Sequence, residues 1–166
     1  MKKLLALFIM LALMLALASC VAPDSEDEIP TGECFTYSQL DSGEYAIVGL
    51  TDEGKTAKTL EIPTEYEGGK VVVIGANTFS GAAVEKLVIT ENTNIRKLEN
   101  GAFAGASGLS SIYIYQPDAE KILPPESFAG THKDLVIYVP EGSYYDTDYF
   151  WSQVPGISDM IEFMGE

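Results

Sequence analysis

The sequence predicts a mainly β repeat protein in which short coils of chain stack into a solenoid. Three features predict this fold: a phenylalanine that recurs after 24 and 25 residues, a short alternating segment that recurs in phase with it, and a glycine two residues after each phenylalanine. One coil of that length cannot enclose a core, whereas stacked coils bury a continuous apolar column.

The phenylalanine repeat is the clearest of these features. The hexapeptides that end in Phe79, Phe103 and Phe128 read IGANTF, LENGAF and LPPESF, and each is followed by a glycine, at position 81, 105 or 130. A large apolar residue that recurs in a stack of coils points into the core. We therefore expect the three rings to form one stacked file inside the solenoid.

Four short segments carry the period of a β-strand. They are LEIP at 60–63, LVIT at 87–90, IYIY at 112–115 and IYVP at 137–140, separated by steps of 27, 25 and 25 residues. Alternation of aliphatic residues with other types is typical of a strand that has one face inward. Strands one repeat apart should pair in parallel along one side of the stack.

Both ends of the repeat region carry signals of a cap. Residues 35–50 alternate and are divided by the turn sequence DSGE at 41–44, which predicts a β-hairpin at the N-terminal end. Near the C-terminus, Ser143 can cap a helix over 144–153, and Pro155 lies beyond its last turn. This pattern predicts a helical cap over the last coil.

Four segments carry a family resemblance: YAIVGL at 45–50, LEIP at 60–63, GGKVVVIGANTF at 68–79 and LVIYVPEGSYY at 135–145. They resemble the BspA-like leucine-rich repeats of bacterial surface proteins. The resemblance covers residues 34–166 and implies a short leucine-rich-repeat solenoid of about three to four coils, with an N-terminal β-hairpin cap and a C-terminal helical cap. It also implies a cell-surface protein with a role in adhesion and binding to host proteins, and no shared catalytic residues.

The N-terminus has the pattern of an export signal. Lys2 and Lys3 precede an apolar run at 4–18 that is too short to span a bilayer, so residues 1–19 are expected to be a lipoprotein signal peptide. The sequence LASC at 17–20 resembles the bacterial lipobox, which makes Cys20 the expected site of lipid attachment. The chain would then be extracytoplasmic and lipid-anchored to the bacterial cell membrane or cell surface. An ordinary secreted protein is the alternative.

Residues 20–33 are expected to be the lipidated cysteine and an acidic, flexible tether. The segment VAPDSEDEIPTGE at 21–33 is polar and contains two prolines, so it cannot bury enough apolar surface to order itself. A lipid would occupy the sulfur of Cys20. We therefore expect Cys34 to be a buried thiol outside any disulfide, with an exposed reactive thiol as the alternative.

Charge and composition argue against several functions. The chain carries 25 acidic and 10 basic residues, a net charge of −15, and loss of Lys2 and Lys3 with the signal peptide makes this −17. Nucleic acid is not expected as a partner, because no cluster of lysine and arginine is present. His132 is the single histidine, so we expect no metal site, no cofactor and no histidine-based nucleophilic centre.

One surface feature follows from the alternation along the predicted strands. Tyr113, Tyr115 and Tyr138 should point outward, and Val88 lines up with Tyr113 and Tyr138 on the neighbouring strands. An exposed row of valine and tyrosines favours a docking strip, because tyrosine offers a large contact area at little entropic cost. The alternative is that these cross-strand pairs only stabilise the sheet.

The leading hypothesis is a non-enzymatic surface lipoprotein that presents a repeat scaffold for adhesion and for binding to protein or glycan. The second is a structural envelope component or spacer without a diffusible ligand. The third is a polymer-degrading hydrolase, which would need two close carboxylates in a cleft. With 25 acidic residues, carboxylate pairs are too common in the sequence to single one out.

Overall fold

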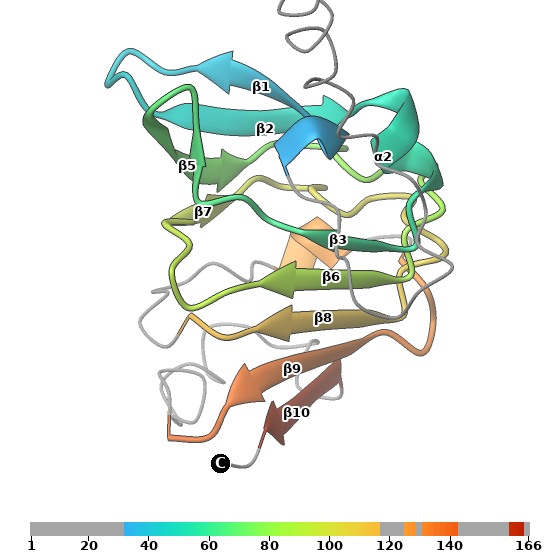
Figure 1. Ribbon diagram of the computed structural model, residues 1–166. Coiled ribbons are helices and arrows are strands. Elements are labelled where there is room, and N and C mark those ends of the chain that lie inside the picture. The colour runs from blue at the N-terminus through green and yellow to red at the C-terminus, as the bar shows by residue number, and fades with distance from the viewer. Residues whose placement is uncertain (1–31, 117–124, 129–130, 143–159, 165–166) are drawn as a thin grey trace, which may run out of the picture.

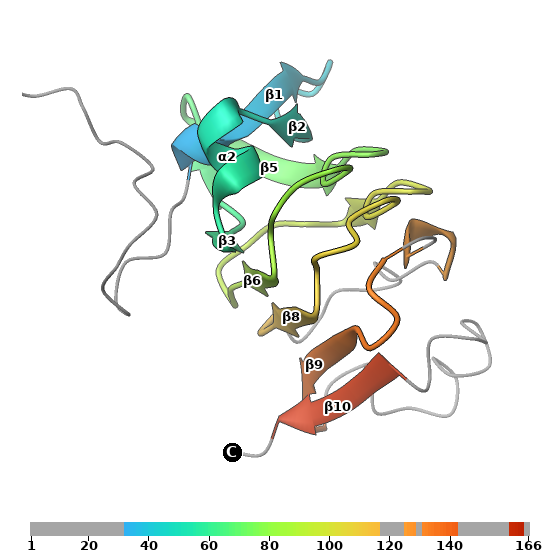
Figure 2. The same ribbon diagram turned by 90° about the vertical axis from the view of Figure 1, so that its right-hand side faces the viewer.

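The computed structural model describes residues 32–116, 125–128, 131–142 and 160–164. Strands β3, β6, β8, β9 and β10 lie one below another in chain order (Figure 1), and the view turned by 90° shows the same coils as successive layers (Figure 2). The architecture is a mainly β solenoid of about four turns, which confirms the predicted fold class.

The stack is built on one five-stranded parallel sheet. Its strands are β3 (Thr59–Glu61), β6 (Lys86–Ile89), β8 (Ser111–Ile114), β9 (Val136–Pro140) and β10 (Ile161–Met164), in the spatial order β10-β9-β8-β6-β3. Leu60, Leu87, Ile112 and Ile137 are consecutive register partners, and all four are buried. The four strands expected from the alternating segments are confirmed, whereas the sequence pattern did not predict β10.

The predicted phenylalanine file runs through the core. The ring centroids of Phe79 and Phe103 lie 5.2 Å apart and those of Phe103 and Phe128 lie 5.3 Å apart, each pair being stacked. Phe128 ends the short 3-10 helix η2 (Pro125–Phe128). All three side chains are buried. The ring spacing is close to the ~4.8 Å between paired strands, so each ring belongs to one layer of the stack.

A second sheet closes the N-terminal end of the stack. It contains β1 (Phe35–Gln39), β2 (Tyr45–Leu50), β5 (Gly69–Ile74) and β4 (Glu65–Tyr66) in that spatial order, and β7 (Lys97–Leu98) pairs with β5. Strands β1 and β2 are antiparallel and turn at Gly43, whose φ is 83°, so the predicted hairpin is confirmed. Strand β2 pairs in parallel with β5, and β5 with β7, which joins the hairpin to the solenoid.

An aromatic cluster fastens the hairpin to the following chain. The rings of Tyr37 and Tyr66 stack with centroids 3.8 Å apart, and the ring of Tyr45 meets Tyr66 edge-on at 5.2 Å. Burial, with a further contribution from Tyr66, raises the pKa of Tyr37 to about 12. A guanidinium nitrogen of Arg96 lies 2.6 Å from the carboxylate of Glu44, which links the hairpin turn to the next coil.

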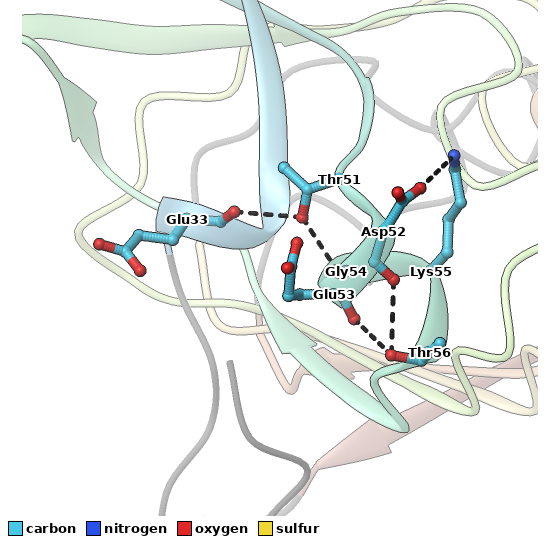
Figure 3. A network of polar contacts seen from close by, with 7 residues as sticks. All are labelled: Glu33, Thr51, Asp52, Glu53, Gly54, Lys55 and Thr56. Carbon is cyan, nitrogen blue, oxygen red and sulfur yellow. Dashed lines mark hydrogen bonds and ion pairs between the residues drawn. The ribbon is translucent and has the colours of Figure 1, made fainter. Parts of the chain in front are cut away.

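A short helix, α2 (Asp52–Thr56), follows β2 and packs against the 3-10 helix η1 (Gly32–Cys34) (Figure 3). Thr51 is its N-cap: the hydroxyl accepts a hydrogen bond from the Gly54 amide at 3.1 Å and donates one to the Glu33 carbonyl at 3.2 Å. Gly32 and Glu33, which the sequence places in the tether, therefore belong to an ordered turn that α2 holds in place.

Other predicted segments lie outside the described residues. These are the signal peptide at 1–19, the tether at 20–31 and the C-terminal helical cap over 144–153. Within the described part of the chain, no helix is both long enough and apolar enough to cross a bilayer.

We predict that Phe103→Ala lowers the free energy of unfolding by about 3–5 kcal/mol, because it removes the central ring of a buried file and leaves a cavity. Urea denaturation followed by circular dichroism measures the change. Val48→Ala is the control, since Val48 is 48% exposed on β2 and its truncation should change stability by less than about 0.5 kcal/mol. A Phe103→Ala loss as small as that of the control would contradict the continuous column.

We also predict that Gly54→Ala destabilises the fold by about 1–3 kcal/mol through overpacking. A Cβ atom at Gly54 would lie 2.0 Å from the carbonyl oxygen of Cys34, so α2 or η1 would have to move. Helix propensity alone favours alanine over glycine by about 1 kcal/mol. A loss of stability would therefore show that the clash with Cys34 outweighs the gain in helix propensity. Lys55→Ala in the same helix is the control, and a gain in stability for Gly54→Ala would refute the close packing of α2 on η1.

Candidate binding surface

The outer face of the parallel sheet carries one continuous row of register partners. Alternation turns Leu60, Ile112 and Ile137 inward, so the residue after each of them faces outward. We define the outer row as Glu61, Val88, Tyr113, Tyr138 and Glu162, which are partners in that order from β3 to β10. At ~4.8 Å between strands, the row spans roughly 19 Å across the sheet.

The structure brings together the three tyrosines that the sequence predicted for this face. The ring centroids of Tyr113 and Tyr138 lie 4.5 Å apart with planes 15° from parallel, and those of Tyr113 and Tyr115 lie 6.4 Å apart at 17°. Tyr115 is 45% exposed, whereas Tyr113 and Tyr138 are half-buried. We call these three residues the tyrosine stack.

Val88 occupies its predicted place in the row but is not exposed. It pairs with Tyr113 on β8 and with Glu61 on β3, and only 7% of it is accessible to solvent. The expectation that Val88 lines the exposed strip is therefore wrong. The valine side chain is shorter than the tyrosine and glutamate side chains of the row, and these are more accessible than Val88.

A lysine that the sequence reasoning did not select completes the surface. Lys86 lies two residues before Val88 on β6, and its ammonium lies over the ring of Tyr113, 4.5 Å from the centroid. An ammonium in this position is attracted by the negative face of the aromatic ring. The position two residues before an outward residue on a strand was the available signal, because both then share a face.

Carboxylates stand at both ends of the outer row. Glu61 ends β3, and Glu162 lies on β10 as the register partner of Tyr138. Partial burial raises the pKa of Tyr138, and the carboxylate of Glu162 and the ring of Tyr113 raise it further. The alternation of LEIP at 60–63 was the available signal for an outward Glu61, whereas Glu162 could not be placed without the unpredicted strand β10.

The described residues contain no cluster of metal ligands, and two of their carboxylates have lowered pKa values. They contain no group of three or more His, Cys, Asp or Glu side chains that could hold a metal ion. Hydrogen bonds from Ser42 and Lys133 lower the pKa of Glu44 and Asp134, respectively, whereas a general acid needs a raised one. The ring of His132 accepts a hydrogen bond from the amide of Asp134 at 3.2 Å within its own loop.

Cys34 differs from its prediction in one respect. It is fully buried, as expected, but it is disulfide-bonded and is not a free thiol. The sequence contains one other cysteine, Cys20, which lies outside the described residues. A disulfide and a lipid cannot share one sulfur, so a disulfide between Cys34 and Cys20 would exclude a lipid on Cys20.

Comparisons with known proteins add little to this description. No family model and no curated protein matches the chain. A solved leucine-rich-repeat protein of T. pallidum aligns with a TM-score of 0.40 and 14% identity, over 68% of this chain and 71% of that one. A structural similarity with so low a TM-score supports no inference about function. The chain is a mainly β solenoid on the strength of its own repeat and strand register.

Proposed function

We propose that the chain is a non-enzymatic cell-surface lipoprotein of the BspA-like kind, whose solenoid presents the tyrosine stack for adhesive contact with a protein or glycan. The observation that carries the proposal is the gathering of Tyr113, Tyr115 and Tyr138 on the outer face of one parallel sheet. Tyr115 is one of the large hydrophobic residues left exposed in the described chain.

The geometry of the stack suits binding. Tyrosine combines a large apolar area with a hydroxyl, and it is among the residues that most often dominate binding energy. Here the rings project from paired strands and are held by stacking, so little side-chain entropy remains to be lost when a partner docks. A rigid surface of this kind favours contact with a preformed partner.

The location of the protein is part of the same proposal and rests on the sequence. The pattern at 1–19 and the LASC at 17–20 support export and attachment of lipid to Cys20. Without Lys2 and Lys3 of the signal peptide the net charge is −17, which disfavours contact with anionic headgroups, so a tethered domain would stand off the membrane surface.

One observation favours a structural role as a second candidate. Val88 is buried and the rings of Tyr113 and Tyr138 already contact each other, as expected if the row only stabilises the sheet. The chain would then serve as a membrane-tethered spacer or envelope component. Binding measurements made beside stability measurements separate the two roles.

We predict that replacing Tyr113, Tyr115 and Tyr138 together by serine lowers the attachment of displaying cells to surfaces coated with matrix protein or mucin glycan at least about tenfold, because several contact residues are lost. Val48→Ser is the matched control, because Val48 is exposed to a similar extent on the other sheet. Unchanged attachment by a triple variant that keeps its circular dichroism spectrum would remove the docking role and favour the spacer.

We further predict that the mature N-terminal peptide begins at Cys20 and carries a diacylglyceryl group, detectable by mass spectrometry. Cys20→Ser should move the protein from the detergent phase to the aqueous phase in a phase-partition assay, because the acyl chains provide the membrane affinity. Cys34→Ser is the control and should stay in the detergent phase. Recovery of an unlipidated Cys20 peptide joined to the Cys34 peptide would refute the anchor.

A further inference from the structure

The outer face combines aromatic rings with carboxylates in a fixed order. The two tyrosines of the outer row lie between Glu61 on β3 and Glu162 on β10, with Val88 buried among them. Aromatic faces and carboxylates both attract cations. The whole chain carries 25 acidic against 10 basic residues, so its long-range field also favours a basic partner.

The structure already contains one example of a cation on this surface. The ammonium of Lys86 lies 4.5 Å from the ring centroid of Tyr113, where it uses the face of an outward ring. A lysine or arginine from a partner can make the same contact in its place. The contact of Lys86 therefore shows that the ring of Tyr113 can bind an ammonium group. It also means that Lys86 competes with an incoming cation for that ring.

The same geometry leaves little of Tyr113 free to stack against a flat sugar. Stacking of a sugar on an aromatic side chain needs a free ring face of the kind that a solvent-exposed tyrosine offers. Tyr113 and Tyr138 turn one face toward each other at 4.5 Å and 15°, and Lys86 covers Tyr113 as well. The faces of Tyr113 are therefore used within the chain, unless a stronger cation displaces Lys86.

We propose that the outer face of the parallel sheet docks a basic, extended protein segment, whose lysine or arginine side chains bind the rings of the tyrosine stack and the carboxylates of Glu61 and Glu162. The inference rests on the proposed docking role and narrows it to one class of partner. At roughly 3.3 Å per residue, about six extended residues cover the roughly 19 Å of the outer row. Alternate residues of such a segment point to the same side and can meet the surface together.

The test measures binding of two short peptides to the full chain, purified in mild detergent. One fluorescent peptide has eight residues that alternate lysine and threonine, and its counterpart has glutamate in place of lysine. We expect the lysine peptide to bind, more weakly at about 0.15 M than at about 0.05 M salt because ions screen the attraction. The glutamate peptide should not bind. Fluorescence anisotropy gives both affinities.

Charge variants then locate the binding. The pair Glu61→Gln and Glu162→Gln should weaken binding of the lysine peptide about threefold to tenfold, because two partner charges are lost. The control pair is Glu53→Gln and Glu65→Gln, which removes two exposed carboxylates from α2 and β4 and should change affinity less than about twofold. Equal losses in the two pairs would overturn the proposal, because binding would then be diffuse attraction to an acidic protein.

Lys86→Met should strengthen binding of the lysine peptide, whereas the glutamate variants should weaken it. It frees the ring of Tyr113 and removes a positive charge, so it should tighten binding of the lysine peptide about threefold, in line with a cation–π contact at an exposed site. A partner that needed Lys86 would bind this variant more weakly. Weaker binding of the lysine peptide to Lys86→Met would therefore overturn the proposal.

The remaining outcomes separate this inference from the docking role itself. If mucin glycan or the glutamate peptide binds in a manner that depends on the three tyrosines, the docking surface stands and the basic partner is wrong. If the lysine peptide binds equally well to the triple serine variant, the rings take no part and the proposal is wrong. Failure of the lysine peptide to bind at either salt concentration also overturns it.

Discussion

The in-register pairing of parallel strands is the constraint on which the rest of this structure depends. Leu60, Leu87, Ile112 and Ile137 meet across four strands, and the stacked phenylalanines run through the same core. Because side chains alternate along a strand, a slip of one residue in any coil would turn its inward residues to solvent and bring its outward residues into the core. The apolar column therefore fixes the register, and the register fixes every residue of the outer face.

This dependence explains why the tyrosine stack has two roles that are hard to separate. Tyr113 and Tyr138 are register partners, so their contact stabilises the pairing of β8 with β9. The same pairing holds the rings still, which favours binding because less side-chain freedom is lost on docking. Tyr115 extends the stack and is the most exposed of the three. A surface built on the register of a solenoid is rigid for the same reason that its core is.

The N-terminal end shows how a short solenoid protects its first coil. A sheet edge offers unpaired backbone groups to other chains, and native proteins cover or cap such edges. Here the hairpin β1–β2 joins the stack through β5, while η1 and α2 pack together beside it. The tyrosine cluster and the Arg96–Glu44 ion pair fasten this cap to the coils that follow. The N-terminal cap is therefore a hairpin with two short helices beside it, and not another repeat of the solenoid.

The sequence by itself determined the features that repeat or are local. The period of the phenylalanines predicted the file of rings, alternation predicted the strands of β3, β6, β8 and β9, and the turn at 41–44 predicted the hairpin. It also aligned Val88 with Tyr113 and Tyr138, because a fixed period sets the register between coils.

Only the tertiary structure decided the second sheet, the strand β10 and the contact between Lys86 and Tyr113. It also decided that Val88 is covered and that Cys34 is disulfide-bonded. These features depend on contacts between segments far apart in the chain and on the relative lengths of neighbouring side chains, and neither leaves a periodic signal in the sequence.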